Sequence, residues 1–148
     1  MKTYLLDTNV ILRFTDTKSS EYNLVNNAIS TILLQRGKCF ITSQVIIEFW
    51  VVATRPLNVN GLGWNIAQTT QAIGMLINQF EILPETPDVF PTWFNLVKNY
   101  NISGKRTHDM RILAVMLTHK ISNILTLNPK DFIAIPEINV IHPRDIHS

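Results

Sequence analysis

The chain has 148 residues with a formal net charge of +2, and 46% of them are hydrophobic while 16% are charged. This length suits a single domain over residues 1–148, which at this size buries roughly 70% of its unfolded surface. The apolar content excludes a disordered chain, and no window has the ~18 consecutive apolar residues of a membrane span. The single cysteine, Cys39, excludes disulfides and a thiolate zinc site, and no signal peptide is evident. We therefore expect a cytoplasmic protein.

Short apolar runs alternate with segments of helical periodicity along the chain. Five of these runs are predicted as strands, namely Lys2–Leu6, Lys38–Ile41, Phe80–Leu83, Asn123–Leu127 and Ile138–Ile141. The segments between them are predicted as helices: Val10–Phe14, Glu21–Gln35, one capped by Thr42 or Ser43 that ends near Thr54, one that ends near Asn78, Asp88–Tyr100, and one capped by Thr107 or His108 that ends near Lys120. Continuous apolar strands alternating with helices indicate an α/β fold, a parallel β-sheet flanked by α-helices.

Ligands in such folds bind beyond the carboxyl ends of the strands, so we consider first the residues that follow each strand. Asp7 follows the first strand directly. A helix N-cap is the simpler interpretation of Asp7 taken alone, because Asp, Thr and Asn all favour that position. Asp109 has a similar simple interpretation, because an acid in the first turn of a helix is stabilised by the dipole by ~0.3–1 kcal/mol.

Glu48 is harder to explain as a structural residue. It is the only charged residue between Lys38 and Arg55, and apolar residues surround it on every helical face. This pattern predicts a helix that is buried nearly all round. A buried carboxylate requires an ion-pair partner, a proton or a metal ion. A structural ion pair with a remote Arg or Lys is the alternative, and we favour a functional role.

Asp7, Glu48 and Asp109 together suggest one acidic site, with Asn128 as a further oxygen donor just past the fourth strand. Converging carboxylates repel one another, so a site that holds three ionised ones needs a cation. Ligands that are all oxygen suit Mg²⁺ or Mn²⁺ better than zinc. Sites of this type commonly serve hydrolysis of a phosphate ester.

Four segments of the chain resemble those of the PIN domains, and of VapC-type toxins in particular. They are Leu5–Leu12, which contains Asp7-Thr8-Asn9, Gln44–Phe49, Thr107–Ala114, and Ile124–Phe132, which contains a Thr-x-Asn-x-x-Asp-Phe block. The four segments occur in the family's order and spacing and span essentially the whole chain. The resemblance implies a PIN-like fold and a Mg²⁺- or Mn²⁺-dependent endoribonuclease that hydrolyses RNA phosphodiester bonds. It also implies the toxin of a type II toxin–antitoxin pair, bound by a cognate antitoxin and usually homodimeric.

The same resemblance implies roles for individual residues. Asp7 and Asp109 correspond to metal ligands, and Glu48 completes the acidic pocket. Many relatives have a fourth acid where this chain has Asn128, a departure that weakens the case for a second metal ion. Two alternatives stand at this position: Asp131 replaces the missing acid, or Asn128 orients a metal-bound water.

The sequence also bears on several functions other than a nuclease. A dinucleotide-binding site is excluded, because Gly61-Leu62-Gly63 follows no strand and the third glycine is missing. The interpretation as a metal-dependent phosphatase is weakened, because Asn9 occupies the position of the second acid in such enzymes. The interpretation as a phospho-accepting receiver domain is weakened as well, because this chain lacks an acidic pair near its N-terminus. A non-catalytic PIN-like module that binds RNA remains an alternative.

Two surfaces are predicted to contact partners. Lys105 and Arg106 are the best candidates for RNA contact, because they come just before the helix that carries Asp109, although a solvated surface is the simpler interpretation of any one basic residue. An apolar groove formed by the helices near Asn23–Leu34 and Phe49–Ala53 is predicted to bind the antitoxin, with core packing or a dimer face as alternatives.

Overall fold

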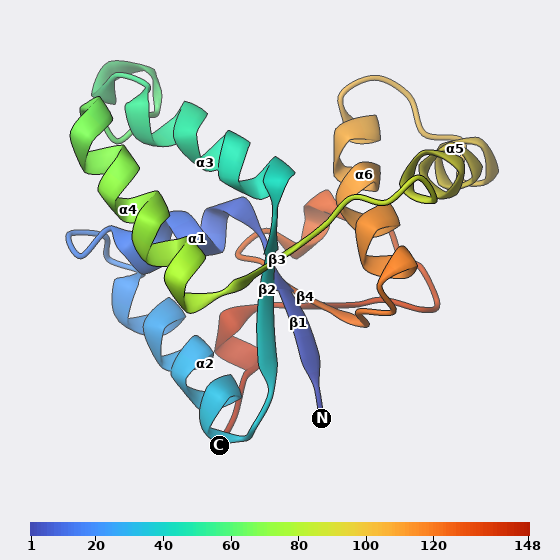
Figure 1. Cartoon of the computed structure of the whole chain (residues 1–148), viewed down its shortest axis with the longest axis horizontal. Helices are drawn as coiled ribbons and strands as arrows, with labels where there is room; N and C mark the ends of the chain where they lie inside the picture. The colour runs from blue at the N-terminus through green and yellow to red at the C-terminus, as the bar shows by residue number, and fades with distance from the viewer.

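The computed structural model describes residues 1–148, and it contains a five-stranded sheet with helices on both sides (Figure 1). The strands are β1 Thr3–Leu6, β2 Lys38–Thr42, β3 Glu81–Leu83, β4 Asn123–Leu125 and β5 Asn139–Ile141. The α-helices are α1 Thr8–Thr15, α2 Tyr22–Leu34, α3 Ser43–Thr54, α4 Ile66–Gln79, α5 Val89–Asn99 and α6 Arg106–Thr118. Three short 3-10 helices complete the fold, namely η1 Leu57–Val59, η2 Pro129–Asp131 and η3 Pro143–Asp145.

The strands are ordered β3-β2-β1-β4-β5 and every neighbouring pair is parallel. In the central strand β1, Tyr4 lies opposite Cys39 of β2 on one side and Asn123 of β4 on the other. Helices α1–α4 lie on one side of the sheet and α5 and α6 on the other (Figure 1). The α/β fold with a parallel sheet is therefore confirmed, and the carboxyl ends of all five strands meet at one edge.

The core explains why the strands are apolar runs without alternation. Leu5 and Leu6 of β1 and Ile124 and Leu125 of β4 are all fully buried, since helices cover both faces of these strands. Each such side chain contributes about 1.5–3 kcal/mol by leaving water. No helix is long and apolar enough to cross a membrane.

Helix α3 differs from its prediction. Ile47 and Val51 are 60% and 52% exposed, so the helix is not buried all round. Its buried face, which includes Val45 and Phe49, packs against α1 and α4, and no element covers the face of Ile47 and Val51. Thr42 does cap the helix, because its hydroxyl accepts from the backbone N–H of Val45 at 3.2 Å.

Helix α6 begins earlier than predicted. Its N-cap is Lys105, without a side-chain hydrogen bond, so the prediction of a cap at Thr107 or His108 is wrong. Gly104 has a φ of +64°, a value that favours glycine, and the turn it forms starts the helix at Arg106. Arg106 therefore lies inside the first turn together with Asp109.

The single apolar groove predicted from α2 and α3 is also absent. Helix α1 packs against both of these helices and lies between them (Figure 1). The exposed apolar side chains of α2, such as Leu34, therefore belong to a different surface from Ile47 and Val51 of α3.

Candidate active site

Asp7 lies where β1 ends and α1 begins, and its side chain is only 7% exposed. It is the N-cap of α1, because its Oδ1 accepts from the backbone N–H of Thr8 at 2.8 Å. Its Oδ2 accepts from the Thr126 hydroxyl at 2.8 Å and from Asn9 Nδ2 at 3.3 Å. The capping interpretation is thus confirmed, and the remaining bonds fix the carboxylate toward the loop after β4.

The surroundings of Asp7 disfavour the ionised form of its carboxyl group. Burial raises the pKa of Asp7 from its ordinary 3.8 to about 6, and the hydrogen bonds from Thr126 and Thr8 lower it. The negative charges of Glu48 and Asp109 make smaller contributions to the same rise, so that about 6 is the net pKa. The carboxyl group of Asp7 therefore exchanges its proton close to neutral pH in the absence of a cation, as is common for functional carboxyl groups.

Glu48 is half-buried and is held by neutral donors. Thr8 Oγ1 donates to its Oε2 at 2.9 Å, and Gln44 Nε2 donates to its Oε1 at 3.1 Å. Gln44 Nε2 also lies 2.9 Å from the carbonyl oxygen of His108, which ties α3 to the start of α6. The ion pairs of the chain are Arg13–Glu21 and Arg111–Glu85, so the alternative of a structural ion pair for Glu48 is wrong.

Asp109 is half-buried in the first turn of α6. Burial raises its pKa most, the charges of Asp131 and Glu48 raise it further, and Arg106 and His108 lower it. Asp131 is in η2, so the acids that influence one another come from four separate segments of the chain. Together Asp7, Glu48, Asp109 and Asp131 form one electrostatic cluster at the carboxyl edge of the sheet, called the acidic edge below.

The acidic edge is not a ready-made coordination shell. No group of three or more His, Cys, Asp or Glu side chains is arranged to hold a metal ion. The chemistry of the donors nevertheless fits Mg²⁺ or Mn²⁺, since all are carboxylate oxygens without thiols or ligating histidines. Burial is the main cause of the raised pKa values of Asp7 and Asp109 and the charges of neighbouring acids add to it, and a divalent cation beside these carboxyl groups would lower both pKa values.

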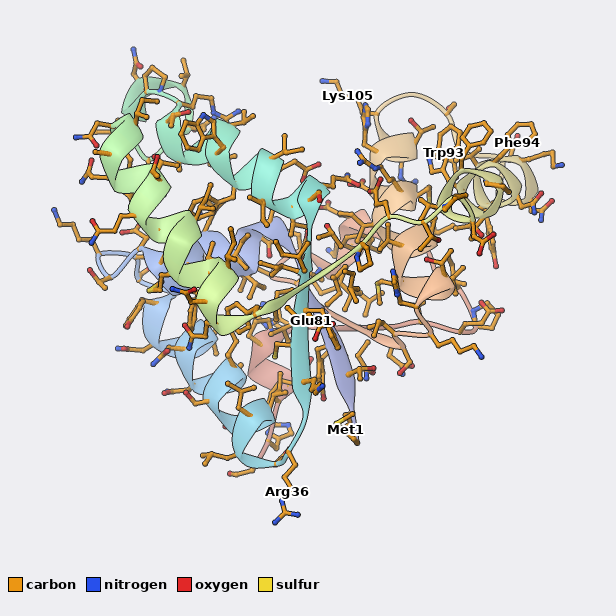
Figure 2. The ribbon with its side chains drawn as sticks, viewed as in Figure 1. Met1, Arg36, Glu81, Trp93, Phe94 and Lys105 are labelled. Atoms are coloured by element: carbon orange, nitrogen blue, oxygen red, sulfur yellow. The ribbon has the colours of Figure 1, made fainter.

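The remaining candidate residues lie around this edge. The Asn128 side chain is exposed and makes no hydrogen bond, although its backbone N–H donates to Thr126 Oγ1 at 3.1 Å. The negative charge that acts on Asp109 from this part of the chain therefore belongs to Asp131 and not to the neutral Asn128. Lys105 and Arg106 are exposed at the N-terminal end of α6, where Figure 2 shows Lys105 extending into solvent.

The polar residues that orient the acids were not predicted from the sequence. Thr8 and Gln44 position Glu48, while Asn9 and Thr126 position Asp7. Asn9 also accepts from the backbone N–H of Leu127 at 2.9 Å, which locks the first turn of α1 to the loop after β4. Thr8, Asn9 and Thr126 could have been found, because they belong to the Asp-Thr-Asn and Thr-x-Asn motifs. The only indication for Gln44 was its position one helical turn before Glu48.

A family model described as PIN domain matches residues 4–138. The chain belongs to the PIN domain family. No curated protein sequence matches this PIN domain, but solved structures share its fold. VapBC2 from Rickettsia felis, bound to a DNA fragment from its promoter, has a TM-score of 0.69 at 19% identity and covers 95% of this chain and 98% of its own.

Two further structures extend the comparison of this PIN domain. VapBC-1 from nontypeable Haemophilus influenzae also has a TM-score of 0.69 at 19% identity, covering 97% of this chain and 99% of its own. VapC20 from Mycobacterium tuberculosis, a toxin that cleaves the sarcin–ricin loop, has a TM-score of 0.60 at 14% identity, covering 82% and 86%. At these identities the likeness concerns the fold.

Proposed function

We propose that this PIN domain is a metal-dependent endoribonuclease and the toxin of a type II toxin–antitoxin pair. The observation that carries the proposal is the acidic edge, where acids from four segments lie near one another and their charges help to raise the pKa values of Asp7 and Asp109. Solved structures with the same fold include VapBC complexes and a toxin that cleaves RNA, which supports both parts of the proposal.

Each residue of the acidic edge has a task in this proposal. Asp7 and Asp109 hold a Mg²⁺ or Mn²⁺ ion, which when bound acidifies water and neutralises charge on the phosphate oxygens. Glu48, whose two oxygens are fixed by Thr8 and Gln44, accepts the proton of the attacking water. Asp131 supplies the fourth carboxylate in place of Asn128. Lys105 and Arg106 contact RNA phosphates beside Asp109.

Cleavage of a structured RNA with Mg²⁺ or Mn²⁺, compared with the same reaction in EDTA, tests the proposal directly. We expect EDTA to abolish cleavage, and we expect Asp109→Asn to be inactive at any metal concentration. Cleavage that continues undiminished in EDTA would contradict the metal mechanism.

A second candidate, RNA binding without cleavage, is favoured by one observation, since no three carboxylates are arranged to hold a metal ion. Wild-type protein that binds RNA but leaves it intact with either metal would support this candidate instead. A phosphatase is disfavoured, because Asn9 orients Asp7 from the position where a second catalytic acid would stand.

We further infer that the exposed apolar side chains of α3 and η1 bind a segment of the antitoxin. Ile47, Val51 and Leu57 are 60%, 52% and 77% exposed, which leaves an apolar surface that water solvates poorly. The structures that share this fold include complexes of toxin with antitoxin. A homodimer is the second assembly we propose for this chain.

A further inference from the structure

Three aromatic side chains of α5 are arranged side by side at the surface. Phe90 and Phe94 are 67% and 50% exposed, their ring planes are parallel to within 1°, and their centroids are 6.2 Å apart. Trp93 also stacks on Phe90, with centroids 6.0 Å apart at an angle of 27°. Exposed aromatic rings lose the stabilisation of burial, so Phe90 and Phe94 indicate a surface that binds a ligand; with the half-buried Trp93 they are called the aromatic row below.

The charge around the aromatic row is positive. Residues 85–111, which include the N-cap of α5 and Glu85 of the adjoining cleft, contain four of the 13 Lys and Arg residues and three of the 11 acids, so this segment carries +1. The Nζ of Lys98 lies 5.0 Å from the centroid of Phe94. Arg111 is paired with Glu85, but Lys98, Lys105 and Arg106 have no carboxylate partner. The surface therefore complements a polyanion.

The aromatic row is joined to the acidic edge. Trp93 Nε1 donates to the carbonyl oxygen of Thr107 at 2.8 Å, two residues before Asp109. Phe90 and Trp93 line a cleft of about 630 Å³ whose other wall includes Thr107 and His108 of α6. Figure 2 shows Trp93 and Phe94 on α5 beside the α6 end that carries Lys105. A chain that passes the acidic edge can thus continue across the aromatic row.

We propose that Phe90, Trp93 and Phe94 form a stacking platform for unpaired nucleotides next to the cleaved bond. The inference rests on the proposed function in that it takes RNA as the substrate, and it adds that the substrate is single-stranded or a loop. Bases can stack on exposed aromatic rings only when they are not already stacked in a duplex, and stacking tolerates any base. Lys98, Lys105 and Arg106 pair with the phosphates that connect the stacked nucleotides.

Binding measured in EDTA tests this platform without cleavage. Fluorescence anisotropy of a labelled 12-nucleotide single strand, and of the same sequence in a duplex, would be compared for the wild type, Phe90→Leu and Phe94→Leu. Leucine keeps the apolar character of the surface and removes the aromatic face. The matched control is Leu34→Ala, which removes an exposed apolar side chain from α2 on the other side of the sheet.

We expect Phe90→Leu and Phe94→Leu each to weaken single-strand binding about tenfold, which is ~1.4 kcal/mol, and to leave duplex binding unchanged. Leu34→Ala should bind as the wild type does. Equal single-strand affinity in all four proteins would overturn the proposal. So would a shift from dimer to monomer in light scattering for the Phe variants, because the aromatic row would then be a protein interface.

Cleavage with Mg²⁺ on the same single strand separates this proposal from the proposed function. A wild type that cleaves, together with Phe variants that bind and cleave equally well, rejects the platform alone. A wild type that does not cleave, with Phe variants that still bind less tightly, rejects the nuclease and keeps the platform.

Discussion

The hydroxyl of Thr126 donates to Asp7 Oδ2 at 2.8 Å, although the two residues are 119 positions apart in the chain. The bond joins the end of β1 to the loop after β4, and it lowers the pKa of Asp7 against the effect of burial. Asp7 therefore depends on a distant neutral residue to remain a carboxylate near neutral pH.

Thr126→Val should raise the pKa of Asp7 above about 6, because valine keeps the shape of threonine and removes the donor. The acidic limb of the pH–rate profile should move to higher pH with it. A carboxyl ¹³C NMR titration of the metal-free protein gives the pKa directly. Thr118→Val is the control, since its hydroxyl bonds only within α6, to the carbonyl oxygen of Val115. The same Asp7 pKa in both variants would refute this role of Thr126.

The metal-free protein should become less stable as pH rises through about 6. Asp7 binds its proton with a pKa of about 6 when folded and an ordinary 3.8 when unfolded, so the stabilisation is full below 3.8 and is lost above 6. The loss amounts to at most ~3 kcal/mol. Urea unfolding in EDTA at pH 5 and pH 8 should capture ~1.4 kcal/mol of this loss, and Asp7→Asn, which keeps a good N-cap, should show much less of the dependence. Identical pH dependence in the two proteins would contradict the prediction.

Asp109→Asn should be as stable as the wild type in EDTA, or more stable, because it removes one of several like charges. Mg²⁺ should raise the melting temperature of the wild type more, by several degrees at 100 times Kd, where binding adds ~2.7 kcal/mol. If Asp109 only stabilises the helix dipole, the variant instead loses ~0.3–1 kcal/mol in EDTA and both proteins respond alike to Mg²⁺. Thermal melts of both proteins under both conditions distinguish these outcomes.

Asp131→Asn should reduce cleavage by at least about tenfold, whereas Asn128→Ala should have a smaller effect. The charge of Asp131 acts on Asp109, while the Asn128 side chain makes no hydrogen bond. Loss of a residue that supports a metal ligand typically costs about 10–100-fold in activity or metal affinity. Initial rates at saturating Mg²⁺ provide the comparison, with Asp145→Asn in η3 as the control for loss of an exposed acid. A larger effect of Asn128→Ala would favour Asn128 as the residue that orients water.

Val51→Asp should prevent the complex with the antitoxin, because it places a charge in the exposed apolar face of α3. Co-expression with the product of the adjacent small gene, followed by affinity purification and size exclusion, measures complex formation. Leu34→Asp, on the separate surface of α2, should leave the complex intact. If the two wild-type proteins elute separately at micromolar concentration, the proposal that this chain binds an antitoxin is wrong.

The strands and the acids Asp7, Glu48 and Asp109 could be predicted from the sequence, because each is marked by the residues next to it in the chain. Continuous apolar runs need cover on both faces, and a parallel sheet brings the residues that follow its strands to one edge. Glu48 was recognised for a similar reason, as a lone charge in an apolar helix. These features follow from pattern alone.

What the sequence did not predict depends on neighbours that are distant along the chain. The exposure of Ile47 and Val51 follows from which helices pack against α3, and no pattern within α3 records that. The hydrogen bond from Gln44 to the carbonyl oxygen of His108, which holds Gln44 beside Glu48, likewise forms only when α3 lies next to α6. The early start of α6 reflects the turn at Gly104, which overrides the stronger capping preference of Thr107.

The central position of β1 has a consequence for the timing of synthesis. Its partner β4 is about 120 residues later in the chain, so a ribosome adds that length of chain before β1 is flanked on both sides. Asp109, Thr126 and Asp131 all lie more than 100 residues after Asp7, so at roughly 5–20 residues per second the acidic edge cannot assemble until several seconds after β1 has been made. A nascent chain that has not reached Thr126 therefore lacks an assembled acidic edge, and any activity of that edge is delayed until the chain beyond β4 has been made.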